Sequence, residues 1–389
     1  MNIIQTDHQY VAGTYKRFPV ALVRGKGARA WDDEGREYID LGSGIAVNCL
    51  GYGDEQWKNA VKAQLDELPH ASNLYQTQPC AQLAQMLCER TGMKKVFFGN
   101  SGAEANECAV KVARKYAFDK YGDDSHSTVI TLKNSFHGRT LAMLSATGQD
   151  HFHQYFGPFT PGFVYADANN LKSVRALAEE HACCAVMVEM IQGEGGVMPL
   201  DYGFVKGIRQ LCDEKDMLFI VDEVQTGNGR TGRLYAYMNF ERQPDVVTTA
   251  KGLGGGLPLG ACLIGENAQN TLGYGDHGST FGGNPVACAG AISILERLDE
   301  RLMQNVRERS AQIFDALNGI RGLKSISGMG LMLGLETERP AIDIVNACLQ
   351  RGVLALTAKT RVRLLPPLTI TKEELAQALS VLKEEIERV

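Results

Sequence analysis

Residues Val246 to Gly265 read "VVTTAKGLGGGLPLGACLIG" and contain the most informative pattern in the chain. This stretch starts with an apolar, β-branched run and ends with a second apolar run, Ala261–Ile264, so we expect a buried strand at each end. Between the two strands, Lys251 precedes a loop that has four glycines within five positions. This lysine is either a solvated surface residue beside a flexible turn or a group that performs chemistry inside whatever the loop surrounds.

Strand and helix patterns alternate on both sides of this stretch. The expected strands are Lys95–Phe98, Thr128–Leu132, Ala185–Glu189, Leu218–Asp222, Val246–Thr249 and Ala261–Ile264. Helical patterns lie between several of them, and such alternation predicts a mostly parallel sheet covered by helices. We therefore expect an α/β fold with a large domain over residues 50–280. A smaller α/β domain is expected from both chain ends, residues 1–49 and 281–389.

Both chain ends have patterns that fit such a smaller domain. In residues 18–41, short apolar runs alternate with glycine-containing turns, which predicts a small antiparallel meander. The C-terminal stretch "TKEELAQALSVLKEEIERV" predicts a helix, because Thr371 and Glu374 fit a capping box. The apolar stripe of this helix consists of Leu375, Leu379, Leu382 and Ile386.

The composition is that of an ordinary soluble protein. The 389 residues are 44% hydrophobic and 22% charged, and the net charge of −5 argues against a nucleic-acid partner, which usually requires a basic face. No apolar run approaches the ~18 residues of a membrane span, and the N-terminus lacks a signal-peptide pattern. The ten cysteines include no CxxC pair, which fits buried, reduced thiols. We expect a cytoplasmic protein without nucleic-acid or membrane partners.

A candidate phosphate site lies in "KVFFGNSGAEANECAVKVARKYAFDKYG", residues 95–122. An apolar strand runs into Gly99, and a helix begins after it with Ser101 as the expected N-cap. Free N–H groups at a helix N-terminus bind phosphate, and Gly102 permits close approach. The alternative is an ordinary strand-to-helix turn with a serine cap. The stretch has neither the GK[ST] ending of a P-loop nor a GxGxxG dinucleotide motif.

A candidate carboxylate site lies in "MLFIVDEVQTGNGRTG", residues 217–232. Apolar residues lead to Asp222 at the carboxyl end of a strand, where α/β sheets place ligands. A buried carboxylate needs a cationic partner, which could be a protonated pyridine nitrogen, a structural arginine or a metal. The metal is the weakest of these partners, because no histidine lies near Asp222 in the sequence. Gln225 could hydrogen-bond a ring hydroxyl.

Other stretches carry side chains that suit a small ligand. Phe136 in "NSFHGRT" could cover a flat cofactor or simply pack in the core, and Arg139 could hold a carboxylate through a bidentate fork. Glu194 lies in the glycine-rich turn of "VEMIQGEGGVMPL". It is either a ligand-binding residue or a solvated loop carboxylate. Ser279 and Thr280 in "HGSTFGGNPVACAG" could donate to a phosphate.

Arg363 lies in the apolar, strand-like stretch "RVRLLPPLTI", which is unusual for a charge without an anionic partner. His137 in "NSFHGRT" is expected to be a hydrogen-bonded structural histidine. His151 and His153 alternate in an aromatic loop with a spacing that metal ligands can have. That spacing alone does not make a site, and we predict no metal.

Together these stretches resemble the class III pyridoxal-phosphate aminotransferases, specifically their acetylornithine branch. The motifs "RGKGARAWDDEGREYIDLGSGIAVNCLG", "SNLYQTQP", "GNSGAEANE", "FHGRT", "QGEGGV", "VDEVQTGNGRTG", "AKGLGGGLPLGA" and "HGSTFGGNPVA" occur in the family's order over nearly the whole chain. The resemblance implies a fold-type I architecture and an obligate homodimer with active sites shared at the interface. Two departures are Met190, where the family usually has proline, and Ala103, where threonine is commoner.

The resemblance also implies roles for single residues. Lys251 is the expected anchor of the pyridoxal 5'-phosphate aldehyde and the catalytic proton carrier, since lysine amines form Schiff bases with such carbonyls. Asp222, the second catalytic residue, is expected to keep the ring nitrogen protonated. The expected cofactor-binding residues are Ser101, Gly102, Ala103, Phe136, Asp222, Glu223, Val224, Gln225, Lys251 and, from the partner subunit, Thr280.

The expected substrate-binding residues are Arg139, Glu194, Ser279 and Arg363. Glutamate must present an amine next to a carboxylate, whereas acetylornithine presents a terminal amine with no carboxylate nearby. We therefore expect a switch: Arg363 binds the α-carboxylate of glutamate in one half-reaction and is neutralised by Glu194 in the other. Arg139 is expected to bind the distant carboxylate of acetylornithine.

The reaction implied is transfer of the δ-amino group of N-acetylornithine to 2-oxoglutarate, which yields N-acetylglutamate semialdehyde and glutamate in arginine biosynthesis. Succinylornithine, ornithine, N-succinyldiaminopimelate and 4-aminobutyrate are alternative donors. Aminomutases and racemases form a different enzyme class on the same scaffold. A non-catalytic binding module predicts the loss of Lys251 or Asp222, and both residues are present.

Overall fold

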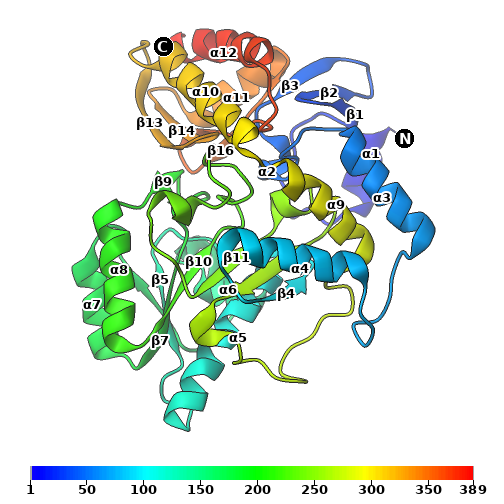
Figure 1. Ribbon diagram of the computed structural model, residues 1–389. Helices are drawn as coiled ribbons and strands as arrows, with labels where there is room; N and C mark the ends of the chain where they lie inside the picture. Colours follow the sequence, from blue (N-terminus) through cyan, green and yellow to red (C-terminus); the bar gives the residue numbers. More distant parts are fainter. Residues whose placement is uncertain (1, 389) are drawn as a thin grey trace.

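A seven-stranded sheet forms the centre of the computed structural model, which describes residues 2–388 (Figure 1). Its strands in spatial order are β4 (Lys95–Gly99), β12 (Gly260–Ile264), β11 (Val246–Thr249), β10 (Leu218–Asp222), β7 (Cys183–Val188), β5 (Thr128–Leu132) and β6 (Phe163–Ala166). Neighbouring strands run parallel except at β12, which is antiparallel to both β11 and β4. The predicted α/β fold with a mostly parallel sheet is therefore confirmed.

The strand β6 lay outside the six expected strands, and among those six β7 differs most from the expectation. The strand β7 begins at Cys183, two residues early, because Cys183 and Cys184 are both buried and continue the apolar run. It ends at Val188. Glu189 therefore lies outside the strand, and its carboxylate is free to bind the main chain of neighbouring loops.

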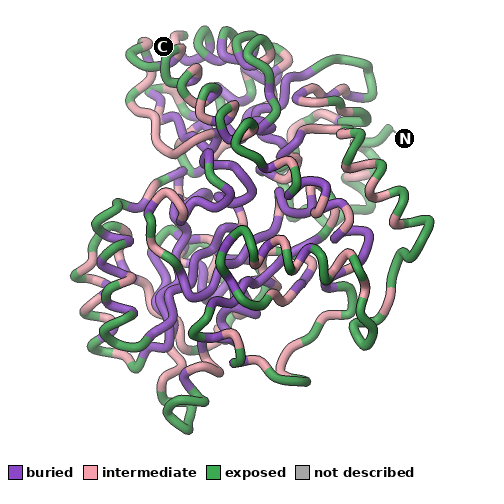
Figure 2. Tube along the Cα trace, viewed as in Figure 1, coloured by how far each residue is buried: buried purple, intermediate pink, exposed green. Residues whose placement is uncertain are grey.

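Helices cover both faces of this sheet, as strands that are apolar on both sides require. The even-numbered residues of β10 pack in one cluster with α5 (Gly102–Tyr121), and the odd-numbered residues pack in another with α8 (Tyr202–Lys215). The neighbouring helix α7 (Leu171–Glu180) packs against α8. Figure 2 shows that the buried residues are concentrated along the strands. Because strand side chains alternate, Asp222 at the end of β10 belongs to the α5 side.

The two chain ends meet in one small sheet. The predicted meander is confirmed, and its strands are β1 (Leu22–Lys26), β2 (Arg29–Asp32) and β3 (Glu37–Asp40), with β15 (Val353–Leu354) added parallel to β3. A second, antiparallel sheet contains β13 (Leu323–Met329), β14 (Met332–Thr337), β17 (Arg361–Leu364) and β16 (Leu356–Ala358). Both sheets lie above the large sheet in Figure 1.

Three C-terminal helices complete this upper unit: α10 (Glu300–Leu317), α11 (Ala341–Gln350) and α12 (Lys372–Glu387). The helix α12 starts with the predicted capping box, in which Thr371 and Glu374 each accept a backbone N–H of the other. The four residues of its expected apolar stripe are buried. The patterns that predicted this helix are therefore confirmed.

After residue 280 the chain first returns to the large unit. There, α3 (Glu55–Glu67), α4 (Gln78–Thr91) and α9 (Pro285–Arg297) pack together. The domain boundaries expected near residues 50 and 280 stay predictions. The remaining elements are α1 (Ile3–Tyr10), α2 (Ser43–Ala46), α6 (Leu141–Ala146), the hairpin of β8 (Ile191–Gln192) and β9 (Met198–Pro199), and 3-10 turns at Asp150–Phe152, Ala236–Asn239, Lys251–Leu253 and Glu266–Ala268. Within residues 2–388, every helix is too short or too polar to traverse a lipid bilayer.

Candidate active site

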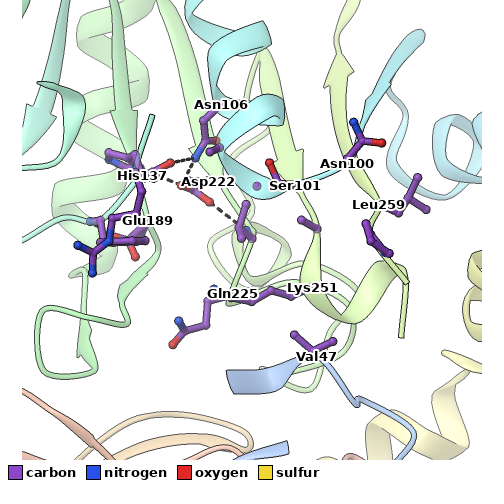
Figure 3. Close-up of a pocket in the computed structure, with 18 of the residues that line it drawn as sticks. Val47, Asn100, Ser101, Asn106, His137, Glu189, Asp222, Gln225, Lys251 and Leu259 are labelled. Carbon is purple, nitrogen blue, oxygen red and sulfur yellow. Dashed lines mark hydrogen bonds and ion pairs between the residues drawn. The ribbon is translucent and has the colours of Figure 1, made fainter. Parts of the chain in front are cut away.

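One cavity of about 450 Å³ lies at the carboxyl-terminal edge of the parallel strands (Figure 3), where open α/β sheets bind ligands. The predicted site residues on its wall are Ser101, Gly102, Ala103, Phe136, Arg139, Asp222, Val224, Gln225 and Lys251. The wall also contains Asn100, Asn106, His137 and Glu189, for which no sequence pattern indicated a ligand-binding role. Folding thus gathers most of the predicted residues in one pocket.

Asp222 is the centre of a buried hydrogen-bonded cluster (Figure 3). Its Oδ2 accepts a bond from Asn106 Nδ2 at 2.7 Å and lies 2.8 Å from His137 Nδ1. Its Oδ1 accepts a bond from Val224 N at 2.9 Å. Asn106 also donates to the His137 carbonyl at 2.7 Å and accepts from Thr248 Oγ1 at 2.6 Å. Both oxygens of the carboxylate are therefore held in fixed directions.

His137 is the histidine next to this buried carboxylate. Burial alone would lower the pKa of His137, but the hydrogen bond to Asp222 and its negative charge outweigh burial and raise the pKa above 6.5. The sequence contained a signal for Asn106, a polar residue on the otherwise apolar face of α5 that needs a buried partner. It contained none that separated His137 from an ordinary core histidine.

Glu189 connects two loops that border the pocket. Its Oε2 accepts a hydrogen bond from Phe136 N at 3.0 Å, and its Oε1 accepts one from Gly193 N at 3.3 Å. Burial raises the pKa of this carboxyl to about 7. One side chain therefore ties the predicted ring-covering residue to the turn that carries Glu194.

The N-terminus of α5 forms another part of the wall. Ser101 is its N-cap as predicted, and Ser101 Oγ accepts a bond from Glu104 N at 3.2 Å. A Cβ on Gly102 would lie 2.6 Å from Val224 Cγ1, so only glycine allows the helix to approach the end of β10 this closely. The first N–H groups of a helix lack intrahelical partners and attract anions. Ser101, Gly102 and Ala103 therefore form a suitable phosphate site.

Lys251 lies on the pocket wall directly after β11, and Figure 3 shows its side chain extending toward Gln225. Its backbone φ is 46°, in the left-handed region that non-glycine residues rarely adopt. Asn228 Nδ2 supports this turn by donating to Thr249 Oγ1 at 3.0 Å and to the Ala250 carbonyl at 3.1 Å. Burial lowers the pKa of the Lys251 amine, and nearby carboxylates offset that effect only in part.

Glu194 and Arg363 meet next to Gln225. Arg363 is 3% exposed; its Nη1 forms an ion pair with Glu194 Oε1 and donates to Gln225 Oε1 at 3.2 Å. Gln225 Nε2 also donates to Glu194 Oε1 at 3.4 Å. Burial alone would raise the pKa of Glu194, but the positive charge of Arg363 lowers it below its usual range. The predicted contact is present, and it neutralises Arg363.

Arg139 lies on the pocket wall, whereas Glu194 and Arg363 are not among the residues that line it. Arg139 Cζ lies 5.5 Å from the ring centre of Phe136 and 4.1 Å from that of Phe152. Its side chain is exposed, and within residues 2–388 its guanidinium makes no hydrogen bond or ion pair. The donors of Arg139 are therefore available to a ligand.

Glu223 does not join the pocket, although it was predicted to bind the cofactor. It is fully buried, and its carboxylate accepts bonds from Thr226 Oγ1 at 2.5 Å and Tyr237 N at 2.8 Å. The reason is the alternation of an extended chain, which directs Asp222 into the pocket and the next side chain away from it. Burial raises the pKa of Glu223 to about 7.

Ser279 and Thr280 also lie off the pocket wall of this chain. Ser279 Oγ accepts bonds from Gly282 N at 2.9 Å and from Asn100 Nδ2 at 3.2 Å, so it connects this loop to the residue before the phosphate turn. Thr280 is exposed. Its contribution to the site of a partner subunit stays a prediction.

The pocket combines groups that fit a phosphorylated pyridine aldehyde. The N-terminus of α5 suits the phosphate, and the amine of Lys251 suits the aldehyde. The carboxylate of Asp222 has fixed oxygens that would accept the N–H of a protonated ring nitrogen. Among residues 2–388, no three His, Cys, Asp or Glu side chains form a group that could hold a metal ion.

Comparison with known proteins agrees with this chemistry. The family model described as aminotransferase class-III matches residues 10–386. The acetylornithine aminotransferase of Haemophilus ducreyi is 50% identical over 384 residues, 98% of each chain. The solved N-acetylornithine aminotransferase of Stenotrophomonas maltophilia is 37% identical, with a TM-score of 0.84 over 99% of this chain and 98% of that one. An ornithine aminotransferase from Toxoplasma gondii with partial occupancy of PLP at its active site is 35% identical, with a TM-score of 0.93 over 99% and 94%.

Replacing His137 should destabilise the protein in a pH-dependent way. Because the pKa of His137 is raised by folding, its stabilisation is complete below the unfolded-state pKa of about 6.5 and is lost as the pH rises through the folded-state value. His137→Gln should therefore lower the free energy of unfolding mainly at low pH, by about 1.4 kcal/mol for each unit by which folding raises the pKa of His137. Thermal unfolding of His137→Gln, wild type and the control His151→Gln, in an exposed position, checks this from about pH 5.5 to 9. An equal loss at every pH would mean that His137 is uncharged.

Proposed function

Because this chain belongs to the class III aminotransferases, we propose that it transfers the δ-amino group of N-acetylornithine to 2-oxoglutarate. The products are N-acetylglutamate semialdehyde and glutamate, and the reaction belongs to arginine biosynthesis. The relatives that are named acetylornithine aminotransferase support this choice of donor.

Pyridoxal 5'-phosphate is the cofactor of this family; when bound, it supplies an aldehyde for the amino group and a ring that accepts electrons. We assign Lys251 to the aldehyde, Ser101–Ala103 at the N-terminus of α5 to the phosphate, and Asp222 to the ring nitrogen. The positions of these residues on one pocket wall support the assignment. We assign Phe136 and Val224 to the two faces of the ring, and Gln225 to a hydrogen bond with its phenolic oxygen.

Lys251 Nζ moves the proton at the substrate carbon that bears the amino group. Burial lowers the pKa of this amine, which favours the neutral form that can accept a proton. Asp222 holds a proton on the ring nitrogen, and Asn106 and His137 keep its carboxylate in the required direction.

The observation that carries the choice of substrates is the contrast between two arginines. Arg363 is paired with Glu194, whereas Arg139 has no acidic partner within residues 2–388. A terminal amine has no carboxylate near the reacting carbon and therefore suits a neutralised Arg363. The distant carboxylate of the same donor suits the free fork of Arg139. In the other half-reaction, the α-carboxylate of glutamate replaces Glu194 on Arg363.

Ornithine is the second candidate donor, because the Toxoplasma relative that is named for it shares this fold. Ornithine has a charged α-amine where N-acetylornithine has a neutral amide, so the two donors place different demands on the outer pocket. An aminomutase or racemase would return the amine to the same molecule. Such an enzyme would not consume 2-oxoglutarate.

The donor can be identified from glutamate formation. With 2-oxoglutarate as acceptor, we expect kcat/KM for N-acetylornithine to exceed that for succinylornithine, ornithine, N-succinyldiaminopimelate and 4-aminobutyrate by about tenfold or more, because a built polar contact discriminates by at least ~1.4 kcal/mol. The variant Lys251→Ala is the control and should form no glutamate. A better donor in this panel would replace the proposed one, and no glutamate with any donor would exclude transamination.

The switch predicts opposite effects on the two half-reactions. Glu194→Gln should slow the half-reaction with N-acetylornithine, because Arg363 is then no longer neutralised, and should spare or speed that with glutamate. Arg363→Lys should slow chiefly the glutamate half, because lysine lacks the planar fork. Breaking such a contact costs ~2–5 kcal/mol, or a factor of tens or more.

The rate of each half-reaction can be measured separately from the absorbance change between the aldehyde and amine forms of the cofactor. Arg361→Lys is a matched control on the same strand, since Arg361 pairs with Glu336 and Ser327 rather than with the pocket residues. Equal impairment of both halves by Glu194→Gln would show that Glu194 only supports its loop.

We also propose that the enzyme is a cytoplasmic homodimer whose sites are shared. The exposed hydroxyl of Thr280 lies in a loop joined to the phosphate turn through Ser279 and Asn100, and this position supports a contact with the phosphate in a second subunit. The free, mostly buried cysteines support a reducing compartment.

Mixing two inactive variants tests the sharing of sites. We expect Lys251→Ala and Thr280→Ala homodimers to be inactive or strongly impaired. A heterodimer should regain activity, because one of its two sites then combines an intact Lys251 with an intact Thr280. Subunits are unfolded and refolded together, and glutamate formation is measured. No recovery in verified heterodimers would show that each site is built from one chain.

A further inference from the structure

The guanidinium of Arg139 lies over an aromatic ring that is not part of the pocket wall. The ring belongs to Phe152, whose centre is 4.1 Å from Arg139 Cζ, well inside the ~6 Å limit of a cation–π contact. Phe136, which does line the pocket, is farther away at 5.5 Å. Phe152 is therefore the closer aromatic support of this arginine.

The turn that carries Phe152 is anchored to the segment that carries Phe136. Phe152 N donates to the Gln149 carbonyl at 3.0 Å. The buried Gln149 side chain donates through Nε2 to the Ser135 carbonyl at 3.0 Å. The rings of Phe136 and Phe152 also meet edge to face, with centres 5.8 Å apart. Phe152 thus has a fixed place relative to the residue proposed to cover the cofactor.

A guanidinium that is held by its face keeps its in-plane N–H donors free for a carboxylate. An exposed arginine with no other partner would otherwise sample many rotamers, and ordering it on binding costs affinity. Contact with a fixed ring reduces that cost before the ligand arrives.

We propose that Phe152 is a positioning residue for the amino donor. It holds the Arg139 fork in place, and it thereby strengthens the binding of donors that carry a carboxylate at the end remote from the reacting amine. This inference rests on the proposed function, in which Arg139 binds that carboxylate.

Two donors that differ only in this carboxylate provide the test. N-acetylputrescine is N-acetylornithine without the α-carboxylate, so it has nothing for Arg139 to bind. Phe152→Leu removes the aromatic face and keeps an apolar side chain, and Phe152→Tyr keeps the face. In the holoenzyme, Phe152→Leu should raise KM for N-acetylornithine about three- to tenfold, a size typical of a cation–π contact plus the ordering of one side chain. Phe152→Leu should leave kcat for N-acetylornithine and the single-turnover rate with N-acetylputrescine unchanged. Phe152→Tyr should have the KM of the wild type for N-acetylornithine.

A double-mutant cycle separates this inference from its premise. Arg139→Ala should weaken N-acetylornithine binding but not that of N-acetylputrescine, and adding Phe152→Leu should then have no further effect on KM. If Arg139→Ala affects both donors equally, the proposed role of Arg139 fails and the inference fails with it. If Arg139→Ala discriminates and Phe152→Leu does not, only the inference is overturned. Equal loss with both donors in Phe152→Leu would overturn it too, since Phe152 would then merely support Phe136.

Discussion

The buried carboxylate of Asp222 is the constraint on which the rest of the site depends. A carboxylate that is removed from water must be hydrogen-bonded and compensated, and here the partners come from α5, from the loop after β5 and from the chain that follows β10. Asn106 binds Asp222, the His137 carbonyl and Thr248 on β11 at once. Satisfying one carboxylate therefore fixes the N-terminal part of α5, the loop after β5 and the strand that leads to Lys251 relative to one another.

The second organising feature is a pair of buried arginines that join the large unit to the sheets of the chain ends. Arg230 is fully buried, and its Nη1 donates to the Leu331 and Pro366 carbonyls. Burial lowers the pKa of Arg230 to about 10. Arg363 reaches in the other direction, from β17 to Glu194. Arg230 therefore binds main-chain oxygens at the junction, whereas Arg363 binds the side chain of Glu194.

Backbone strain occurs at Lys251 and in a turn that packs against it. Lys251 itself has a positive φ, and the turn Ser43–Ala46, which packs against it, contains Ile45 at a φ of 61°. A left-handed conformation costs about 1–2 kcal/mol per residue and persists only where neighbours enforce it. Ser43 Oγ donates to the Leu365 carbonyl at 2.6 Å, so the small unit helps to hold this turn. The lysine is thus placed by the tertiary structure rather than by local preference.

Local sequence patterns determined the parts of this protein that depend on near neighbours in the chain. Apolar runs and cap residues predicted six of the seven strands of the central sheet, the Ser101 cap and the α12 capping box, because these features need only a few consecutive residues. The ordered motifs identified the family, and the ends of strands pointed to Asp222 and Lys251. These signals reached fewer than half of the residues that line the pocket.

Only the tertiary structure decided which polar groups meet. Glu223 has the same chemistry as Asp222, yet alternation directs it to Thr226 and Tyr237. His137 and Phe152 obtained their places from contacts with Asp222 and Arg139. Hydrogen bonds, ion pairs and cation–π contacts act over a few ångströms in space between residues that are far apart in the chain, and no local pattern in one sequence records them.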